Sequence, residues 1–477
     1  MFKLTSTASV LSFALLAGCS LAPDYQRPAA PVAAAYPETR SASAAATTAA
    51  GDVPWREFFT DARLQRLIAL ALENNRDFRV AGLNVERIRA LYDIQRTAWL
   101  PTLDLKADGT RRRTPGDLNN TGRPVTSSTY EVGGSVSSYE LDFFGRIASL
   151  RDQVLQQYLA TEEARHSAQL SLISAVARQY LSLLAIDEQL ALARQTFDAA
   201  EKSYALNKET FDAGITSELD LRTSEAQREA VRASVAVYRQ QRAQAENALV
   251  LLVGGPLPAD LPAPGNLATQ NLIDDLPAGL PADLLARRPD VRAAEHSLQA
   301  ANANIGAARA AFFPAVELTA FGGTASAGLN GLFQPGSGAW SFSPTITLPI
   351  FAAGKNKATL KAAWIDQRIG VANYERAIQT AFREVADALA VRATIDVQIS
   401  AQEARVSAAQ RRYDLSDQRF KIGVDSFVSV LLAQQELFSA RQSLIQARLA
   451  RLANLTALYT ALGGGWENAA PVVATKG

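Results

Sequence analysis

Four stretches of the chain alternate apolar and polar residues, with the period of two that is typical of β-strands. They occur as two pairs, and each pair predicts a β-hairpin, over residues 102–142 and 315–350. The apolar positions are Leu103, Leu105 and Ala107; Tyr130, Val132 and Val136; Val316, Leu318 and Ala320; and Trp340, Phe342, Ile346, Leu348 and Ile350. At about 9–11 residues each, the strands are long enough to cross a bilayer. A soluble antiparallel sheet with one wet face remains an alternative.

The predicted hairpins carry different residues at their tips and at their strand ends. The tips, residues 111–124 and 328–338, are rich in Gly, Pro, Asn and Arg, as exposed loops are. Large aromatic residues, Trp99, Phe312, Phe313 and Trp340, lie near the predicted strand ends. Aromatic residues gather at both interfaces of a membrane, so these positions favour the membrane interpretation of the strands.

Two much longer segments predict helices, residues 147–211 and 355–420. The first contains neither proline nor glycine and the second contains only Gly370, while Ala, Leu, Gln, Arg and Glu dominate both. A helix of about 65 residues measures about 97 Å. A cytosolic helical rod would show the same pattern, so the helices alone do not decide the class of protein.

Shorter helices are predicted on both sides of each long one. A helix precedes each hairpin, over residues 77–99 and 290–312, and we expect Asp77 and Asp290 to be the N-caps. A glycine turn, a capping serine and a return helix follow each long segment: Gly214, Ser217 and residues 217–252, then Gly423, Ser426 and residues 426–462. The two shorter helices of each set add up to about 89 Å, so they can stack end to end beside the long one.

The chain is duplicated. Residues 211–217 align with residues 420–426 at an offset of about 209 positions, and Gly254 and Gly255 align with Gly463 and Gly464 at the same offset. Trp99 to Pro101 aligns with Phe313 and its neighbours at about 213. We therefore predict a signal peptide (1–18), an N-terminal tether and equatorial segment (19–60), repeat 1 (61–255), an equatorial linker (256–282), repeat 2 (283–464) and a C-terminal tail (465–477).

Four membrane strands cannot form a closed structure by themselves, because lipid tolerates no open sheet edge. Eight strands, from two chains, give a barrel that side chains fill, and twelve strands, from three chains, leave room for a lumen. The predicted fold is therefore mainly α with membrane β: a homotrimeric 12-stranded β-barrel, four strands per chain, continued by a long periplasmic α-helical barrel.

The first residues resemble the signal and lipobox of a bacterial lipoprotein. A short positive start and a brief apolar run lead to Leu16-Ala17-Gly18-Cys19, and Cys19 is the one cysteine of the chain. The resemblance implies lipidation of Cys19, with an N-acyl chain and an S-diacylglycerol, and Ser20 in the next position favours the outer membrane. An ordinary signal peptide with an incidental cysteine is the alternative.

The composition of the chain argues against several classes of function. The net charge of +1 lacks the basic character of a nucleic-acid binder. The two histidines, His166 and His296, have no companions at metal-ligand spacing, and no phosphate-binding or nucleophile motif is present. We expect no enzyme activity, no metal and no cofactor other than the covalent lipid.

Several segments together resemble the TolC/OprM outer-membrane factor family, and OprM-like efflux lipoproteins in particular. They are residues 19–28 (CSLAPDYQRP), 55–59 (WREFF), 140–146 (ELDFFGR), 284–290 (LLARRPD) and 461–466 (ALGGGW). The resemblance implies an exit duct in the outer membrane that conducts drugs or other small toxic compounds passively. Its partners would be a periplasmic adaptor protein and an inner-membrane pump of the resistance–nodulation–division type, which supplies the energy.

The family closes its duct at the periplasmic helical tips, which correspond here to residues 211–222 and 420–435. The positions of the family's apolar and acidic rings are matched by Val428 and Leu432, and that of a following arginine by Gln435. Leucine at the acidic position favours an apolar gate over an electrostatic one, although both side chains can simply pack in the coiled coil. Further gate candidates are Asp220 and Arg222, and candidate adaptor contacts are Gly214, Thr216, Ser217, Gly423, Asp425 and Ser426.

Two other functions remain open at this point. One is a channel for protein secretion by an ABC-type exporter, and the other is a lipid-anchored structural spacer that conducts nothing. The lipobox and the OprM-like segments favour efflux over protein secretion, and the structural spacer differs from an efflux duct in that its strands would not close a membrane barrel.

Overall fold

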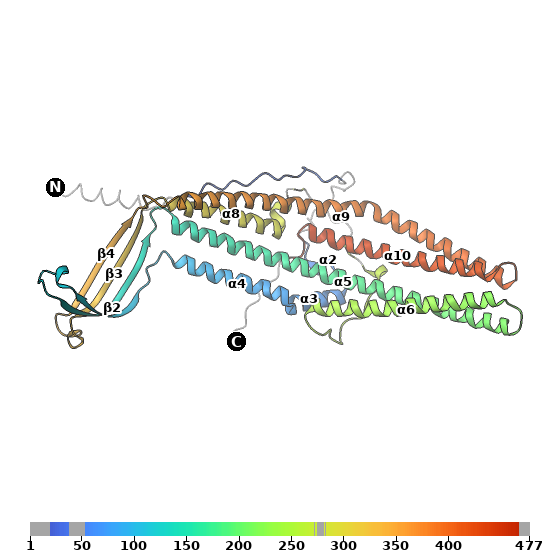
Figure 1. The fold of residues 1–477 in the computed structure, drawn as a ribbon. Helices are drawn as coiled ribbons and strands as arrows, with labels where there is room; N and C mark the ends of the chain where they lie inside the picture. The colour runs from blue at the N-terminus through green and yellow to red at the C-terminus, as the bar shows by residue number, and fades with distance from the viewer. Residues whose placement is uncertain (1–19, 38–52, 271, 274–280, 282, 467–477) are drawn as a thin grey trace. The chain divides into compact units, whose positions relative to one another are not determined.

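The computed structural model describes residues 20–37, 53–270, 272–273, 281 and 283–466. The predicted signal peptide and Cys19 lie outside these residues, as do parts of the tether, of the linker and of the C-terminal tail. The chain consists of long helices and one β-sheet (Figure 1).

The helices are α2 (Trp55–Phe58), α3 (Ala62–Asn74), α4 (Arg76–Thr97), α5 (Arg146–Asp212), α6 (Glu218–Val253), α7 (Asp283–Arg287), α8 (Pro289–Ala310), α9 (Lys355–Lys421) and α10 (Phe427–Ala461). The strands are β1 (Asp104–Thr114), β2 (Val125–Leu141), β3 (Ala315–Ser326) and β4 (Gly338–Thr347). The described residues also form the 3-10 helices η3 (Gly116–Leu118), η4 (Leu267–Thr269) and η5 (Leu329–Gly331). The two longest helices, α5 and α9, have 67 residues each, as the absence of helix breakers in these segments predicts.

The chain divides into two compact units. The first comprises Met1–Ala29, Val85–Thr161 and Ala293–Tyr374, and the second comprises Ala30–Asn84, Glu162–Arg292 and Glu375–Gly477. The sheet belongs to the first unit, and the turns of both helical hairpins belong to the second.

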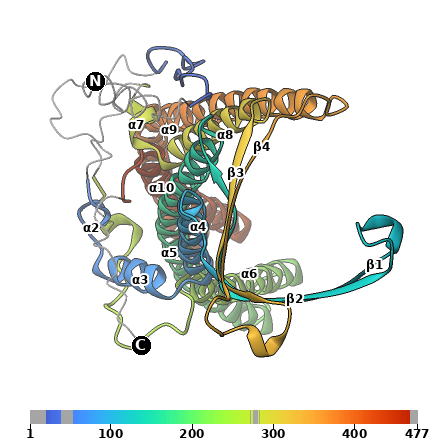
Figure 2. The same cartoon turned by 90° about the vertical axis from the view of Figure 1, so that its left-hand side faces the viewer.

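The sheet of the first unit is antiparallel throughout, with the strand order β1-β2-β3-β4. It is strongly curved, as the view in Figure 2 shows. A β-bulge interrupts β2 between Val136 and Tyr139, where Ser138 has a positive φ of 49°. Its two outer strands, β1 and β4, are paired on one side only within the described chain. Both edges therefore present unpaired backbone donors and acceptors.

Small side chains bring the helices of the first unit close together. Ile305 and Ala308 of α8 form a buried cluster with Ala363 of α9. A Cβ atom on Gly306 would lie 2.4 Å from the hydroxyl of Ser149 in α5 and 2.7 Å from the backbone nitrogen of Ala22. Glycine therefore permits α8 to contact α5 and the N-terminal segment at the same point.

The second unit contains two helical hairpins, α5 with α6 and α9 with α10 (Figure 1). Its core is rich in aromatic residues: the ring of Phe58 stacks on that of Tyr459 with a centroid distance of 4.0 Å, and Phe59 meets Phe58 edge-on. Tyr180 is fully buried, and its hydroxyl donates to Asp61 over 3.1 Å. The N-terminal segment α2–α3 is thus fixed against both repeats.

Helix α5 contains an 18-residue window that is long and apolar enough to cross a membrane by length and composition. Buried positions make up 67% of that window. Along α5, Ile173, Val176 and Ala177 are fully buried in the core of the second unit. Packing inside the protein therefore accounts for the apolar character of α5, as in the core helix of a soluble domain.

Several predicted boundaries differ from the structure by one to three residues, and the reasons for some of them can be identified. Helix α4 starts at Arg76, because Asn75 and not Asp77 accepts the hydrogen bond from the backbone of Phe78, at 2.9 Å. Helix α8 starts at Pro289, since proline fits the first helical position, and it ends at Ala310. Strand β4 ends at Thr347, the partner of the first residue of β3, so residues 348–350 have no strand to pair with.

Candidate functional site

The sheet has one apolar and one polar face, and the strand register fixes which residues share each. Leu105 lies opposite Gly134, Gly134 opposite Gly322, and Gly322 opposite Trp340. The same face carries Leu103, Ala107, Val132, Val136, Val316, Leu318, Phe342 and Ile346. The other face carries Asp104, Lys106, Asp108, Glu131, Ser135, Glu317, Thr319, Ser341, Ser343 and Thr345.

The apolar face is exposed along the two outer strands and half-buried along the two inner ones. Leu105 is 83% exposed, Trp340 82% and Ile346 70%. A soluble sheet buries its apolar face against another layer and wets the polar one. This sheet instead leaves the apolar face open, as a strand that contacts lipid does.

Aromatic residues lie at both ends of the sheet. Trp99, Phe312 and Phe313 are exposed at the end where the helices join it, and the hydroxyl of Tyr139 donates to the carbonyl of Trp99 over 2.8 Å. Trp340 lies near the hairpin tips, as the third residue of β4. This distribution matches the aromatic girdles of membrane barrels.

The turn between α5 and α6 is held by local bonds. Gly214 has a φ of 73°, which favours glycine, and the hydroxyls of Thr210 and Thr216 are 3.0 Å apart. Ser217 caps α6 by accepting from the backbone of Asp220 over 3.2 Å, and its hydroxyl donates to the Asp220 carboxylate over 2.7 Å. Asp220 is therefore used within its own turn.

Arg222 is paired within α6. Its guanidinium contacts Glu225 at 2.8 Å and Glu218 at 3.4 Å. The hydrogen bond to Glu225 is the main reason that the pKa of Arg222 is raised. A latch between Arg222 and another helix would have to compete with these two carboxylates.

The turn between α9 and α10 has an equivalent glycine but is held by an ion pair. Gly423 has a φ of 76°, and Arg419 holds Asp425 across the turn through two hydrogen bonds of 2.7 and 3.0 Å. The guanidinium lowers the pKa of the Asp425 carboxyl below its ordinary value of 3.8. The carboxyl of Asp425 therefore stays ionised, and the ion pair stays formed, down to a pH below 3.8. Ser426 occupies the N-cap position of α10 but makes no side-chain capping bond.

Val428, Leu432 and Gln435 share one face of α10, because they are spaced four and three residues apart. Val428 is 41% and Leu432 51% exposed. Gln435 donates to Gln227 of α6 over 3.0 Å, so this face of α10 begins to contact the first hairpin at that level. The side chains of Val428 and Leu432 therefore lie outside the buried core of the single chain.

Each return helix meets a preceding helix end to end, as predicted, through a residue that the sequence did not single out. Asn75 donates to the carbonyl of Leu252 over 2.9 Å, where α6 ends and α4 begins. In the second repeat Arg288 donates to the carbonyl of Ala461 over 3.0 Å, where α10 ends and α8 begins. Arg288 also binds Asp290 and Glu384. Asn75 and Arg288 occupy equivalent positions, at the offset of 213 that relates these helices, but they are different residue types, so the alignment of the repeats does not point to their shared role.

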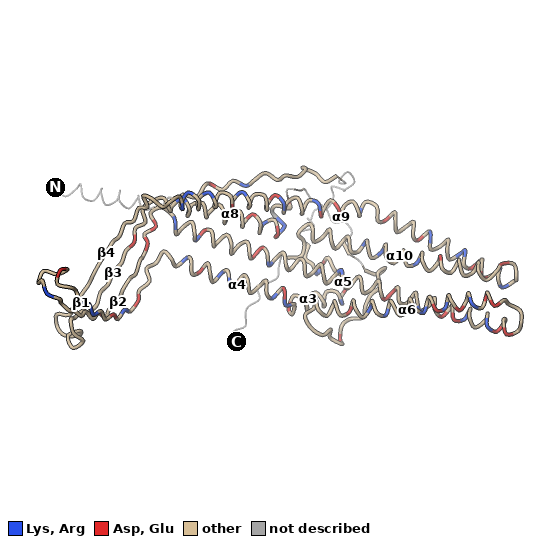
Figure 3. The backbone as a smooth tube through the Cα atoms, viewed as in Figure 1, with Lys and Arg blue, Asp and Glu red and all other residues tan. Residues whose placement is uncertain are grey.

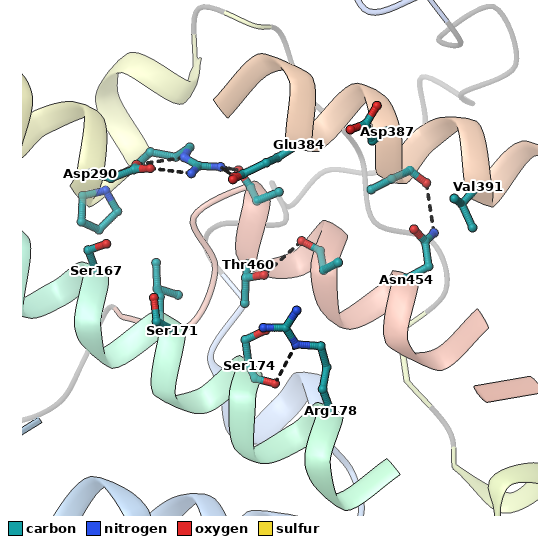
Figure 4. Close-up of a pocket in the computed structure, with 16 residues that line it drawn as sticks. Ser167, Ser171, Ser174, Arg178, Asp290, Glu384, Asp387, Val391, Asn454 and Thr460 are labelled. Carbon is teal, nitrogen blue, oxygen red and sulfur yellow. Dashed lines mark hydrogen bonds and ion pairs between the residues drawn. The ribbon is translucent and has the colours of Figure 1, made fainter. Parts of the chain in front are cut away.

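A polar recess of about 520 Å³ lies between α5, α8, α9 and α10 in the second unit (Figure 4). Asp290 and Glu384 flank the guanidinium of Arg288 there. Hydroxyls of Ser167, Ser171 and Thr460 line the rest, and none of the lining residues is a histidine or cysteine.

The N-terminal segment forms a strap along α8 that sequence reasoning did not resolve. Arg309 donates to the carbonyl of Leu21 over 2.8 Å, and Asn302 to that of Pro23 over 2.7 Å. Arg27 binds both oxygens of the buried Glu295, at 2.7 and 3.0 Å. The α8 residues are seven apart and so share a face. Six extended residues and fourteen helical ones both span about 20 Å.

The side chains of both histidines contact residues that are distant in the sequence. His296 shares a 2.7 Å hydrogen bond with Gln156, and the ring of His166 stacks on Trp466 at 4.8 Å. Among the residues that the structure describes, no three His, Cys, Asp or Glu side chains are grouped to hold a metal ion.

The sequence matches the family model described as "Outer membrane efflux protein" over residues 67–255 and 280–464, one segment in each repeat. The chain belongs to the outer membrane efflux protein family. The resemblance inferred from its motifs is thereby confirmed, as are the mainly helical fold, the four antiparallel strands and the duplication.

Named relatives agree along the whole length. The chain is 49% identical to the solvent efflux pump outer membrane protein SrpC of Pseudomonas putida, over 95% of this chain and 97% of that one. It is 46% identical to the antibiotic efflux pump outer membrane protein ArpC of the same species, over 96% of each. The open state of the MtrE outer membrane channel of Neisseria gonorrhoeae superposes with a TM-score of 0.86, at 40% identity, over 94% of this chain and 99% of that one.

This outer membrane efflux protein is thus a channel component of the bacterial outer membrane and not an enzyme.

Proposed function

We propose that three copies of this chain form a closed channel, with β1 of one copy paired to β4 of the next. A bilayer tolerates no open sheet edge, and each copy brings two. Two copies would give a barrel filled by side chains, whereas three give twelve strands and a lumen. The observation that carries the proposal is the register of the sheet, with its exposed apolar face and opposed polar face.

The helices of the three copies would continue the channel as a periplasmic tube that closes at the turns of the hairpins. Val428 and Leu432 support an apolar gate, since their side chains are exposed on one face of α10 in the single chain. Three copies of such a pair would exclude water from a narrow passage. The local pairing of Asp220, Arg222 and Asp425 argues against an electrostatic lock as the main closure.

The cargo would be small toxic compounds. SrpC and ArpC are named for solvent and antibiotic efflux, which favours export of such compounds over protein secretion. The channel would receive them passively from a resistance–nodulation–division pump through a periplasmic adaptor. The adaptor would contact the hairpin turns around Gly214, Thr216 and Ser217 and around Gly423, Asp425 and Ser426.

Cys19 would anchor the N-terminus in the outer membrane through its covalent lipid. Each buried CH₂ group contributes about 0.8 kcal/mol, so several acyl chains hold firmly. The strap that begins at Leu21 would keep this anchor beside α8.

Single-channel conductance in planar bilayers, with the mass of the purified protein measured in detergent, tests this function. We expect a trimeric mass and a small conductance that is rarely open. A monomer that never conducts, even with the hairpin turns loosened by mutation, would contradict the channel and favour a structural lipoprotein.

A further inference from the structure

The first β-hairpin carries a concentration of positive charge at its tip. Residues 111–124 contain four arginines, Arg111, Arg112, Arg113 and Arg123, and a single acidic residue, Asp117. The tip of the second hairpin, residues 327–337, contains no charged residue at all. Figure 3 shows the blue segments along the β1–β2 hairpin. A loop that only needs to be soluble does not require this asymmetry.

Two of these arginines continue the apolar face of the sheet. Counting by twos along β1, Arg111 and Arg113 follow Leu105, Ala107 and Gly109. The contacts with β2 support this assignment of faces, because a Cβ atom on Gly109 would lie 3.2 Å from the ring of its partner Tyr130. Tyr130 therefore lies on the apolar face directly before the two arginines. Arg112 points to the opposite, polar face.

The spacing places both guanidinium groups at the boundary of the apolar band. Arg111 and Arg113 lie eight and ten residues beyond Leu103, about 26 and 33 Å along a strand. For a strand tilted by about 40° these lengths correspond to about 20 and 25 Å of membrane depth, and the apolar band of such barrels is about 25 Å tall. An aromatic residue followed by arginine marks this interface.

The two guanidinium groups are available for a ligand. Both arginines are exposed, and across the described residues neither makes an ion pair or a side-chain hydrogen bond. Their partners in the register are Ser128 and Thr126, whose small side chains do not cover them. The tip beyond is compact, since Asn119 donates to the carbonyls of Pro115 and Arg123 over 2.9 and 2.8 Å.

We propose that Arg111 and Arg113 bind phosphate groups on lipids of the outer leaflet. Guanidinium matches phosphate through paired hydrogen bonds, and lipid phosphates lie at the depth that the strand gives to these side chains. The inference rests on the proposed placement of the sheet in the membrane. It adds a lipid contact that fixes the height and tilt of the first hairpin.

The test compares R111S/R113S with R112S, which removes an arginine of the same strand from the opposite face. Binding of bisphosphorylated lipid A to the purified full-length protein is measured in mild detergent by native mass spectrometry. We expect the double variant to bind at least about tenfold more weakly, because two guanidinium groups that can each form charge-assisted hydrogen bonds to phosphate are lost. R112S should stay within about twofold of the wild type.

Three outcomes would overturn the inference. They are equal binding by R111S/R113S, an equal loss in R112S, and competition by inorganic phosphate at the concentration of the lipid, which would indicate a site for free anions. Conductance of the same preparations separates this inference from the channel itself. A wild-type protein that conducts but binds no phosphorylated lipid refutes the lipid site alone, whereas one that never conducts refutes the channel.

Discussion

At the scale of single residues, the fold depends on a few positions where two helices pack so closely that only glycine fits between them. Gly254 closes α6 in the left-handed conformation, with a φ of 82°. A Cβ atom there would lie 2.4 Å from the carbonyl oxygen of Asn74. Gly214 has a similar φ of 73°, but nothing lies within 4 Å of the corresponding Cβ position. A substitution at Gly214 therefore introduces backbone strain alone, whereas one at Gly254 introduces strain and a steric collision.

We predict that G254A destabilises the protein more than G214A does. The strain of a positive φ costs about 1–2 kcal/mol for alanine at either site. The collision with backbone raises the cost at Gly254 to about 3 kcal/mol or more. Thermal unfolding followed by tryptophan fluorescence checks the ranking. Equal midpoints for the two variants would show that the joint between α6 and α4 tolerates displacement.

Some residues were beyond the reach of sequence reasoning. The pairing of Arg27 with Glu295 joins positions 268 residues apart, and no local pattern indicates such a contact. Asn75 and Arg288 are chemically different residues in equivalent joints, so similarity between the repeats does not mark them as partners. Long-range contacts between polar side chains depend on packing that periodicity does not encode.

At the scale of elements, alternation and the absence of helix breakers were sufficient to predict the sheet and the long helices. The gate is less determined. Val428 and Leu432 repeat at helical spacing, and that spacing fits a lumen-facing pair as well as a buried seam. The structure adds that both remain exposed within one chain.

We predict that V428S/L432S raises the open probability of the channel about tenfold, the change that corresponds to about 1.4 kcal/mol of lost apolar contact. The measurement is single-channel recording of the double variant against the wild type. L206S is the control, since Leu206 of α5 is 53% exposed and Leu432 is 51% exposed. Unchanged opening of correctly inserted V428S/L432S would assign both residues to packing.

At the scale of the whole molecule, the proposed function gives membrane attachment two independent sources. The sheet would insert through its apolar face, and Cys19 would add a lipid. The strap binds α8 through residues that follow the cysteine, and these contacts do not require acylation.

We therefore predict that C19A abolishes incorporation of labelled lipid while the mass in detergent and the conductance of the assembled channel stay the same. Metabolic labelling followed by purification checks the first part, and bilayer recording checks the second. Continued labelling of C19A would refute the lipoprotein assignment. Loss of assembly would show that the lipid also guides insertion.

The strap has a consequence for the order of events in the life of the chain. Its partners on α8 lie 268 to 288 positions later in the sequence. Chains are synthesised from the N-terminus, so the strap is made long before its binding surface exists. The strap therefore has no binding surface on α8 until the second repeat has been synthesised. A segment that is synthesised early thus reaches its final position only after the second repeat has been made.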